Sequence, residues 1–198
     1  MICIIDYGVG NLGAVSNMLK RLGIEVVTSG DSEVIARADK LLLPGVGSFD
    51  YAMERLHSTG LYTVLDHQVR FEKKPILGIC LGMQLMCNGS EEGQLPGFGW
   101  IDADVTKFHL EGLKVPHMGW NHVAHRSSSL TTSSDRERYY FVHSYFVTCH
   151  NSSDIMYTTV FGNEFVSGFR RENVIGVQFH PEKSHRFGME LLRSYCES

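Results

Sequence analysis

The residues best suited to covalent chemistry lie in the segment Gly78-Ile79-Cys80-Leu81-Gly82. An apolar run leads into this segment and a helical pattern leaves it, which is typical of a nucleophile elbow. At such a sharp turn, side chains two residues on either side of the nucleophile would collide, so glycine is favoured at both places. The turn would place the sulfur at a helix N-terminus, where the thiolate is favoured, with the Leu81 amide aimed at an oxyanion. A buried packing cysteine is the alternative, but the paired glycines favour a nucleophile.

A thiolate that transfers acyl groups needs a histidine partner, itself oriented by a third group. Among ten histidines, His180 is the best candidate, because it ends the apolar strand of VIGVQFHPE (174–182). If that strand runs parallel to 73–79, His180 and Cys80 share the sheet edge where ligands collect in α/β proteins. Glu182 could turn back across Pro181 and fix the imidazole tautomer. His180-Pro181-Glu182 alone is equally compatible with a surface turn, but together with Cys80 it predicts a Cys-His-Glu triad.

Two other patterns give weaker hypotheses. Gly8, Gly10 and Gly13 form a GxGxxG motif after a strand, which keeps a dinucleotide-binding oxidoreductase open as an alternative. The acidic residue expected about 20 residues later is displaced to Asp31, so a tight strand-to-helix turn is favoured. His117 and His122 flank Trp120 without a ligand spacing, so no metal site is expected. His143 is interpreted as a strand residue with satisfied partners.

Composition limits the elements that can hold these residues. The chain has 198 residues and a net charge of −4, which argues for one domain over 1–198 and against a basic nucleic-acid surface. No apolar run of about 18 residues is present to cross a membrane. The N-terminus is interpreted as a strand and not as a signal peptide. With no export signal, the five cysteines, none of them in a CxxC pair, are expected to stay reduced in the cytoplasm.

The order of patterns predicts an α/β fold. The first half alternates apolar runs with helical spacing, which predicts a mostly parallel central sheet flanked by helices. The second half alternates apolar and polar residues, which predicts an antiparallel extension. A polar loop is expected over 127–138. The predicted strands are 2–6, 24–29, 40–45, 73–79, 100–108, 139–147, 154–160, 164–169 and 174–182. The predicted helices are 11–23, a short helix capped by Asp31, two within 48–74, 81–87 and 187–195.

Three segments together resemble the class I, triad-type glutamine amidotransferases: PGVGSF (44–49), GICLGMQ (78–84) and GVQFHPE (176–182). The resemblance implies that Cys80 attacks the side-chain amide of glutamine, that His180 transfers protons and that Glu182 orients His180. It implies no cofactor. It also implies an oxyanion site made by Leu81 with Val46 or Gly47, and a glutamine site that uses Gly47, Gln84, Ser144 and Tyr145.

Within that family, the likeness is greatest to glutaminase subunits of imidazole glycerol phosphate synthases, which serve histidine biosynthesis. DYGVGNLG (6–13), KVPHMGWN (114–121) and YFVHSYF (140–146) carry this likeness. It implies a heterodimer with a separate (βα)8-barrel cyclase, which receives ammonia and makes imidazole glycerol phosphate and an aminoimidazole carboxamide ribotide. The glutaminase would be nearly silent until the partner binds its ligand. The implied interface residues are Asn11, Pro116, His117, Met118 and Trp120.

One segment departs from that likeness. KSHRFG (183–188), with a second histidine at His185, resembles paralogues that supply ammonia for surface-polysaccharide sugars. The triad would be the same in such a paralogue, but the acceptor of the ammonia would differ.

Overall fold

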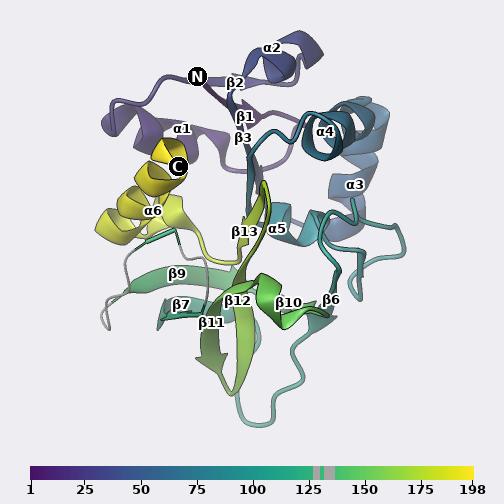
Figure 1. Cartoon of the computed structure of the whole chain (residues 1–198). Coiled ribbons are helices and arrows are strands. Elements are labelled where there is room, and N and C mark those ends of the chain that lie inside the picture. Colours follow the sequence, from purple (N-terminus) through teal and green to yellow (C-terminus); the bar gives the residue numbers. More distant parts are fainter. Residues whose placement is uncertain (127–129, 132–136) are drawn as a thin grey trace.

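The apolar runs of the first half form the parallel part of one large sheet. The computed structural model describes residues 1–126, 130–131 and 137–198, so most of the loop expected at 127–138 lies outside the described residues. The sheet order here is β2-β1-β3-β4-β13, and all four pairings are parallel. The carboxyl ends of β3, β4 and β13 therefore meet at one edge (Figure 1). These strands are β1 (Ile2–Ile5), β2 (Val26–Ser29), β3 (Lys40–Gly45), β4 (Ile76–Cys80) and β13 (Val174–Val177).

Beyond β13 the sheet becomes antiparallel and continues as β12-β10-β6. β11 pairs with β12 and β8, and the short β5 (Gly89–Ser90) runs parallel to β6. This arrangement confirms the predicted α/β class with an antiparallel second half. The strands added here are β6 (Ala103–Lys107), β8 (Ala124–His125), β10 (Tyr145–Cys149), β11 (Ile155–Phe161) and β12 (Asn163–Arg171).

A separate two-stranded sheet pairs β7 (His117–His122) with β9 (Arg138–His143). The prediction of a single strand over 139–147 is wrong, because β9 ends at His143 and β10 starts at Tyr145 in the large sheet. Burial alternates along β9, but Tyr145 and Phe146 at the start of β10 are both half-buried, and the unbroken run of mostly apolar residues gives no sign of the crossing at Ser144. The strand predicted over 174–182 ends early, at Val177, and the next residues turn toward β9.

Helices cover both faces of the parallel strands (Figure 1). α1 and α6 bury Val15, Leu19, Leu191 and Leu192 against one face, while α2 to α5 pack on the other. Among the described residues, no helix is long and apolar enough to cross a membrane. The helices are α1 (Leu12–Arg21), α2 (Ser32–Arg37), α3 (Phe49–Ser58), α4 (Leu61–Arg70), α5 (Leu81–Leu85) and α6 (His185–Glu197), with 3-10 turns η1 (Ser152–Asp154) and η2 (Pro181–Lys183).

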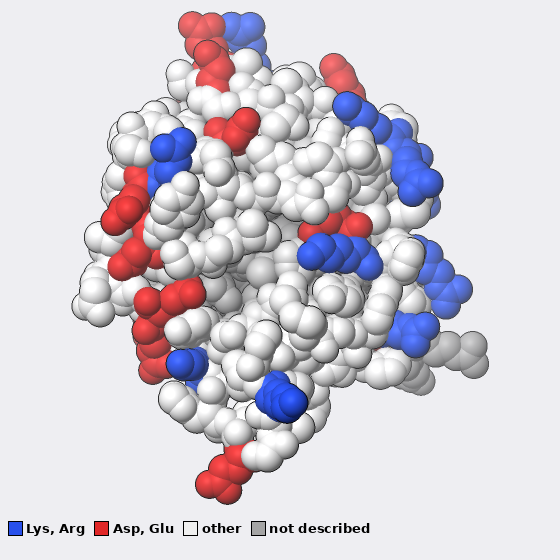
Figure 2. Space-filling view, turned by 180° about the vertical axis from the view of Figure 1, so that it is seen from behind, with Lys and Arg blue, Asp and Glu red and all other residues white. Residues whose placement is uncertain are grey.

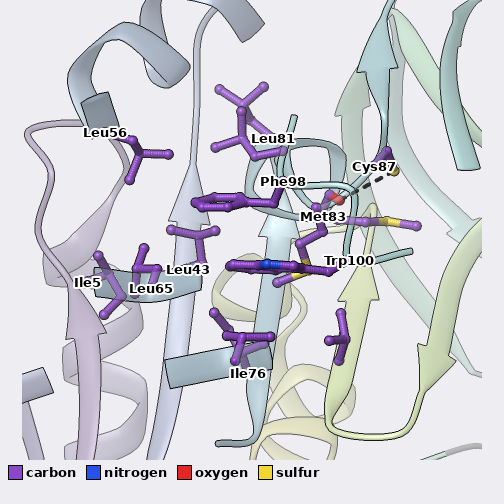
Figure 3. Packing of buried hydrophobic residues seen from close by; sticks show 14 of the residues in the cluster. Ile5, Leu43, Leu56, Leu65, Ile76, Leu81, Met83, Cys87, Phe98 and Trp100 are labelled. Carbon is purple, nitrogen blue, oxygen red and sulfur yellow. Dashed lines mark hydrogen bonds between the residues drawn. The ribbon is translucent and has the colours of Figure 1, made fainter. Parts of the chain in front are cut away.

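The core on the α3–α5 face is organised around two stacked aromatic rings. The centroids of Phe98 and Trp100 lie 3.9 Å apart, with Leu43, Leu81 and Ile76 around them (Figure 3). The amide N–H groups of Phe98 and Trp100 donate to the carbonyls at the end of α5, on Leu85 and Met86. The loop after α5 therefore anchors the helix that follows Cys80.

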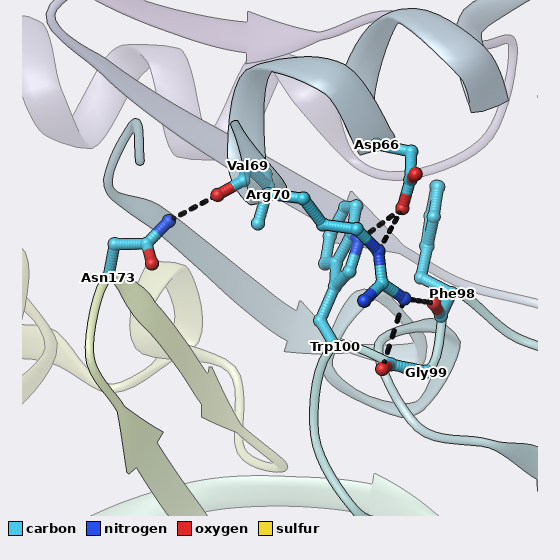
Figure 4. Close-up of polar contacts among 7 residues, drawn as sticks. All are labelled: Asp66, Val69, Arg70, Phe98, Gly99, Trp100 and Asn173. Carbon is cyan, nitrogen blue, oxygen red and sulfur yellow. Dashed lines mark hydrogen bonds and ion pairs between the residues drawn. The ribbon is translucent and has the colours of Figure 1, made fainter. Parts of the chain in front are cut away.

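A polar cluster fixes the same loop to α4 (Figure 4). Arg70 pairs with Asp66 at 2.7 Å and donates to the carbonyls of Phe98 and Gly99. Asp66 also accepts from the Trp100 indole N–H at 2.8 Å. These bonds pair the carbonyls of Phe98 and Gly99 and the indole N–H of Trp100 with side chains of α4. The loop is therefore held in place at the end of the sheet that lies away from Cys80.

Charge is distributed unevenly over the surface. On the face seen in Figure 2, acidic side chains gather along one edge, basic side chains lie along the other, and uncharged atoms cover most of the middle.

Candidate active site

The backbone at Cys80 has the strained geometry that the elbow requires. Cys80 has φ 56° and ψ −111°, a left-handed conformation that non-glycine residues rarely adopt, at the junction of β4 and α5. A Cβ on Gly82 would overlap the carbonyl oxygen of Leu43, and one on Gly78 would lie 2.7 Å from the Gly82 carbonyl oxygen. Both glycines flanking the turn are therefore required by packing, as their spacing predicts.

His180 lies at the same sheet edge, because β13 is parallel to β4 with Val177 opposite Ile79. The chain then leaves the strand, and the His180 N–H donates to the Tyr140 carbonyl of β9 at 2.9 Å. The Ser184 hydroxyl donates to the His180 carbonyl and accepts from the Tyr140 N–H. These bonds fix the backbone of His180 between the two sheets.

Glu182 turns back to the imidazole through η2. Its Oε1 lies 2.7 Å from Nδ1 of His180, and the two side chains are only 3% and 2% exposed. An ionised carboxylate accepts, so Nδ1 carries the hydrogen and Nε2 is the ring nitrogen left for the reaction. Nε2 has no hydrogen-bond partner within the described residues.

Opposing effects set the charge of His180. Burial alone would lower its pKa, but the Cys80 sulfur and the Glu182 carboxylate together outweigh burial and raise the pKa to about 9. Burial and the charge of Cys80 also raise the pKa of Tyr7, whose hydroxyl donates to the Pro44 carbonyl. The site therefore favours the imidazolium form of His180 at neutral pH.

A cavity of about 350 Å³ opens above Cys80. It brings together residues from six separate parts of the chain, and a small amino acid fits in such a volume. The sequence-predicted residues that line it are Val46, Gly47, Cys80, Leu81, Gln84, Pro116, Ser144, Tyr145 and His180, and the lining residues that sequence reasoning missed are Glu92, Val142, His143 and Lys183.

The missed residues left different signals in the sequence. Lys183 directly follows the His-Pro-Glu tripeptide, so proximity could have identified it. Glu92 lies in a polar loop that gives no such signal, and its carboxylate accepts from the Phe49 N–H at the start of α3. Only the fold brings Glu92 to the cavity.

Gln84 has its amide hydrogens committed within the protein. Its Nε2 donates to the Tyr145 carbonyl at 3.1 Å and to Oε1 of Gln178 at 3.0 Å. Gln178 in turn donates to the sulfur of Cys80 at 3.7 Å. Gln84 therefore has only its Oε1 to offer a bound glutamine, and Gln178 is a neighbour of Cys80 that sequence reasoning did not single out.

Four of the five residues expected at a partner interface are exposed. Asn11 caps α1, Pro116 lies beside the cavity, and Met118 and Trp120 are 62% and 43% exposed. His117 departs from the expectation, because its side chain is buried and bonded to His143. Alternate residues of a strand face opposite ways, so exposing Met118 and Trp120 turns His117 inward.

The first glycine turn is explained by packing. Gly8 and Gly10 have positive φ, and a Cβ on Gly10 would press on the Pro44 carbonyl at 3.3 Å. The Arg55 guanidinium fills the space beside Gly8, with its Nη2 only 3.0 Å from where a Cβ would stand. Among the residues placed in the structure, no group of three or more His, Cys, Asp or Glu side chains could hold a metal ion.

Comparison with known proteins finds relatives that match the chain over its whole length. Relatives named imidazole glycerol phosphate synthase subunit HisH 2 come from Methanococcus maripaludis, 48% identical, and Pseudomonas aeruginosa, 47% identical, each covering 100% of this chain and 99% of the relative. The subunit HisH of Bdellovibrio bacteriovorus is 47% identical, with 100% of both chains covered.

Solved structures share the fold at low sequence identity. A crystal structure of a glutamine amidotransferase superposes with a TM-score of 0.77 at 18% identity, covering 100% of this chain and 98% of the other. PurLQS from Thermotoga maritima gives a TM-score of 0.74 at 18% identity, covering 99% and 97%. Residues 3–196 match the family described as glutamine amidotransferase class-I, and the chain belongs to that family.

Proposed function

We propose that this chain is the glutaminase subunit of an imidazole glycerol phosphate synthase, which hydrolyses glutamine at Cys80 and passes the ammonia to a cyclase partner. The observation that carries the proposal is the strained Cys80 on one cavity with His180, whose Nδ1 is held by Glu182. The names of relatives that are 47–48% identical over the whole chain support the choice of synthase.

In the first step, the Cys80 thiolate attacks the side-chain amide carbon of glutamine and forms a tetrahedral oxyanion. The imidazolium of His180 then gives its Nε2 proton to the leaving nitrogen. Carbon–nitrogen cleavage releases ammonia and leaves a γ-glutamyl thioester on Cys80. Glu182 stabilises the imidazolium and keeps Nε2 directed at the reacting atoms.

In the second step, His180 is neutral and takes a proton from water, which attacks the thioester carbonyl. Collapse of the second tetrahedral intermediate releases glutamate and restores the Cys80 thiolate beside the His180 imidazolium. The proton given to ammonia is thus replaced by one from water, and the enzyme returns to its starting state.

The oxyanion donors lie on two elements. The Leu81 amide opens α5 next to Cys80, and the second donor is the amide of Val46 or Gly47 after β3. Gly47 has φ 99°, and a Cβ there would meet nothing within 4 Å, so the peptide has room to rotate. We infer that the partner turns this amide toward the oxyanion, which keeps the glutaminase nearly silent without it.

The partner is a (βα)8-barrel cyclase that covers the exposed face formed by Asn11, Pro116, Met118 and Trp120. Exposed aromatic and methionine side chains are typical of interface centres. The complex would act in the cytoplasm, where the five cysteines, all free here, stay reduced.

The test is glutamate release with and without a histidine-pathway cyclase, comparing the wild type with Cys80→Ala. We expect the wild type to release glutamate mainly in the complex, and the variant to lose at least about 10³-fold in rate, the scale set by nucleophile deletions. Retained glutaminase activity in Cys80→Ala would rule the mechanism out.

A second candidate is a paralogue that supplies ammonia to a surface-sugar pathway. The segment KSHRFG (183–188) favours it, because this segment, with its second histidine at His185, resembles such paralogues. Mass spectrometry of proteins that co-purify with this chain separates the two candidates. Recovery of the histidine-pathway cyclase, with formation of imidazole glycerol phosphate by the pair, would exclude the paralogue.

A further inference from the structure

A buried amide reaches the proposed nucleophile from the segment that joins β13 to His180. Gln178 is fully buried, and its Nε2 lies 3.7 Å from the Cys80 sulfur. Its Oε1 accepts from Gln84 at 3.0 Å, and its backbone N–H donates to the Ser167 carbonyl of β12. Both ends of the side chain are therefore occupied, which fixes its position.

The surrounding bonds determine which end of the Gln178 amide faces the sulfur. Gln84 points one atom at both the Tyr145 carbonyl and Gln178, and since a carbonyl only accepts, that atom is Nε2. Gln178 must then present its oxygen to Gln84 and its N–H to Cys80. Reversing Gln178 alone would set two NH₂ groups against each other, and reversing both amides would set the Gln84 oxygen against the Tyr145 carbonyl oxygen.

The Tyr145 carbonyl accepts from a second donor, and this starts a chain of hydrogen bonds that leads away from the active site. Nδ1 of His143 lies 2.8 Å from it, and Nε2 of His143 lies 3.0 Å from Nδ1 of His117. Nε2 of His117 meets Nδ2 of Asn121 at 3.1 Å. The Asn121 oxygen accepts from the His122 N–H, so Nδ2 donates.

The two ends of this chain require the same tautomers. From Asn121, each histidine accepts at Nε2 and donates at Nδ1, and the last hydrogen arrives at the Tyr145 carbonyl, which needs a donor. Burial lowers the pKa of His143 to about 3 and that of His117 to about 4, so both rings are neutral. All polar bonds from Asn121 to the sulfur therefore have a defined direction.

We propose that Gln178 stabilises the Cys80 thiolate by donating a hydrogen bond to its sulfur, and that Gln84, which is fixed by the Tyr145 carbonyl, holds the Gln178 amide in that orientation. A donor to the charged form favours ionisation. The hydrogen bonds that run from Asn121 to the same Tyr145 carbonyl start on β7, the strand whose opposite face exposes Met118 and Trp120. The inference rests on the proposed role of Cys80 as nucleophile.

The experiment measures the rate of Cys80 alkylation by iodoacetamide against pH in the full chain, with the Cys80 peptide quantified by mass spectrometry apart from the other four cysteines. Other titratable groups that face the sulfur or its cavity are His180 with Glu182, Tyr7, His143, Glu92 and Lys183, and all are kept unchanged. We expect Gln178→Met, which keeps the length but has no donor, to raise the apparent pKa of Cys80 and slow alkylation at pH 7 about tenfold. Gln178→Glu, which keeps the shape and places a carboxylate at the sulfur, should slow it further.

The matched control is Ser167→Ala, which removes a buried hydroxyl bonded to Thr159 on the neighbouring strand without touching the sulfur. Its alkylation profile should equal that of the wild type. A folded Gln178→Met with a wild-type profile would overturn the inference.

If neither Gln178 variant folds, NMR of the wild type decides, because the Gln178 side-chain NH₂ must shift with the same apparent pKa as Cys80. A side-chain signal that ignores the titration would also overturn the inference. Neither readout depends on glutamine turnover, so retained activity in Cys80→Ala would refute the proposed function separately.

Discussion

The same side-chain type takes opposite charge states at two buried positions of this site. His180 lies between a sulfur and a carboxylate, which favour imidazolium, whereas His143 lies between a carbonyl and a neutral histidine, and burial keeps it uncharged. Sequence reasoning identified Cys80, His180 and Glu182 because they stand beside turn residues with fixed spacing. It missed Gln178, because nothing in the sequence shows that folding places this polar residue, within the apolar run predicted as the strand 174–182, beside the Cys80 sulfur.

The dependence of His180 on Glu182 gives a prediction for Glu182→Gln. Without the carboxylate, the pKa of His180 falls, the imidazolium no longer forms readily beside the thiolate, and glutamate release falls roughly 10²-fold, the scale of general acid–base catalysis. Initial rates from pH 6 to 10 with the partner present would measure this. An unchanged pH profile would contradict the role given to Glu182.

The same pair predicts how stability changes with pH. The pKa of His180 is raised from 6.5 to about 9 by folding, so its contribution to the free energy of unfolding is complete below pH 6.5 and is lost as pH rises through 9. Breaking a buried pair costs about 3 kcal/mol, so urea unfolding should separate the wild type from Glu182→Gln by that amount at pH 6. The difference in the free energy of unfolding between the wild type and Glu182→Gln should be smaller at pH 10. A difference that does not change with pH would show that the stabilisation has another origin.

Elements with local signals were predictable, and elements set by long-range pairing were not. β3 occupies the predicted 40–45, because an apolar run ends there at Pro44-Gly45. β7 was not predicted as a strand, since Pro116 and Gly119 interrupt its pattern and only its pairing with β9 makes it one. The split of 139–147 into β9 and β10 has the same cause, as each half finds its partner in a different sheet.

Two glycines at equivalent helix positions test the packing at the elbow. Gly82 and Gly13 are each the second residue of a helix, but a Cβ on Gly82 would overlap the Leu43 carbonyl oxygen, while one on Gly13 would meet nothing within 4 Å. Gly82→Ala should lower the free energy of unfolding by about 3 kcal/mol, because the new Cβ forces β3 and α5 apart. Gly13→Ala should raise the free energy of unfolding by about 0.5 kcal/mol. Thermal unfolding of both variants measures this, and equal effects would refute the packing argument.

The topology explains why one end of the molecule carries the chemistry and also a surface for a partner. The carboxyl ends of β3, β4 and β13 place Gly47, Cys80 and His180 around one cavity, and the antiparallel half closes it with Ser144 and Tyr145. The parallel half could be predicted because apolar strands joined by helices share direction. The closing half could be predicted only as a set of antiparallel strands, and the order of those strands in the sheet could not, since it depends on contacts between residues distant in sequence.

Trp120 is the residue through which this end is expected to bind the cyclase. Its ring is 43% exposed yet already ordered, stacked on His185 at 5.5 Å with the Arg138 guanidinium 5.6 Å from its centre. An ordered aromatic loses little freedom on binding, so Trp120→Ala should weaken the complex by about 2 kcal/mol, or roughly 30-fold in Kd. The matched control is Phe71→Ala, which removes a ring that is 72% exposed next to the residues that begin β13, at the opposite end of the sheet. Titration calorimetry with the cyclase should show a loss of affinity for Trp120→Ala and none for Phe71→Ala. Equal affinities for the two variants would show that Trp120 does not lie in the interface.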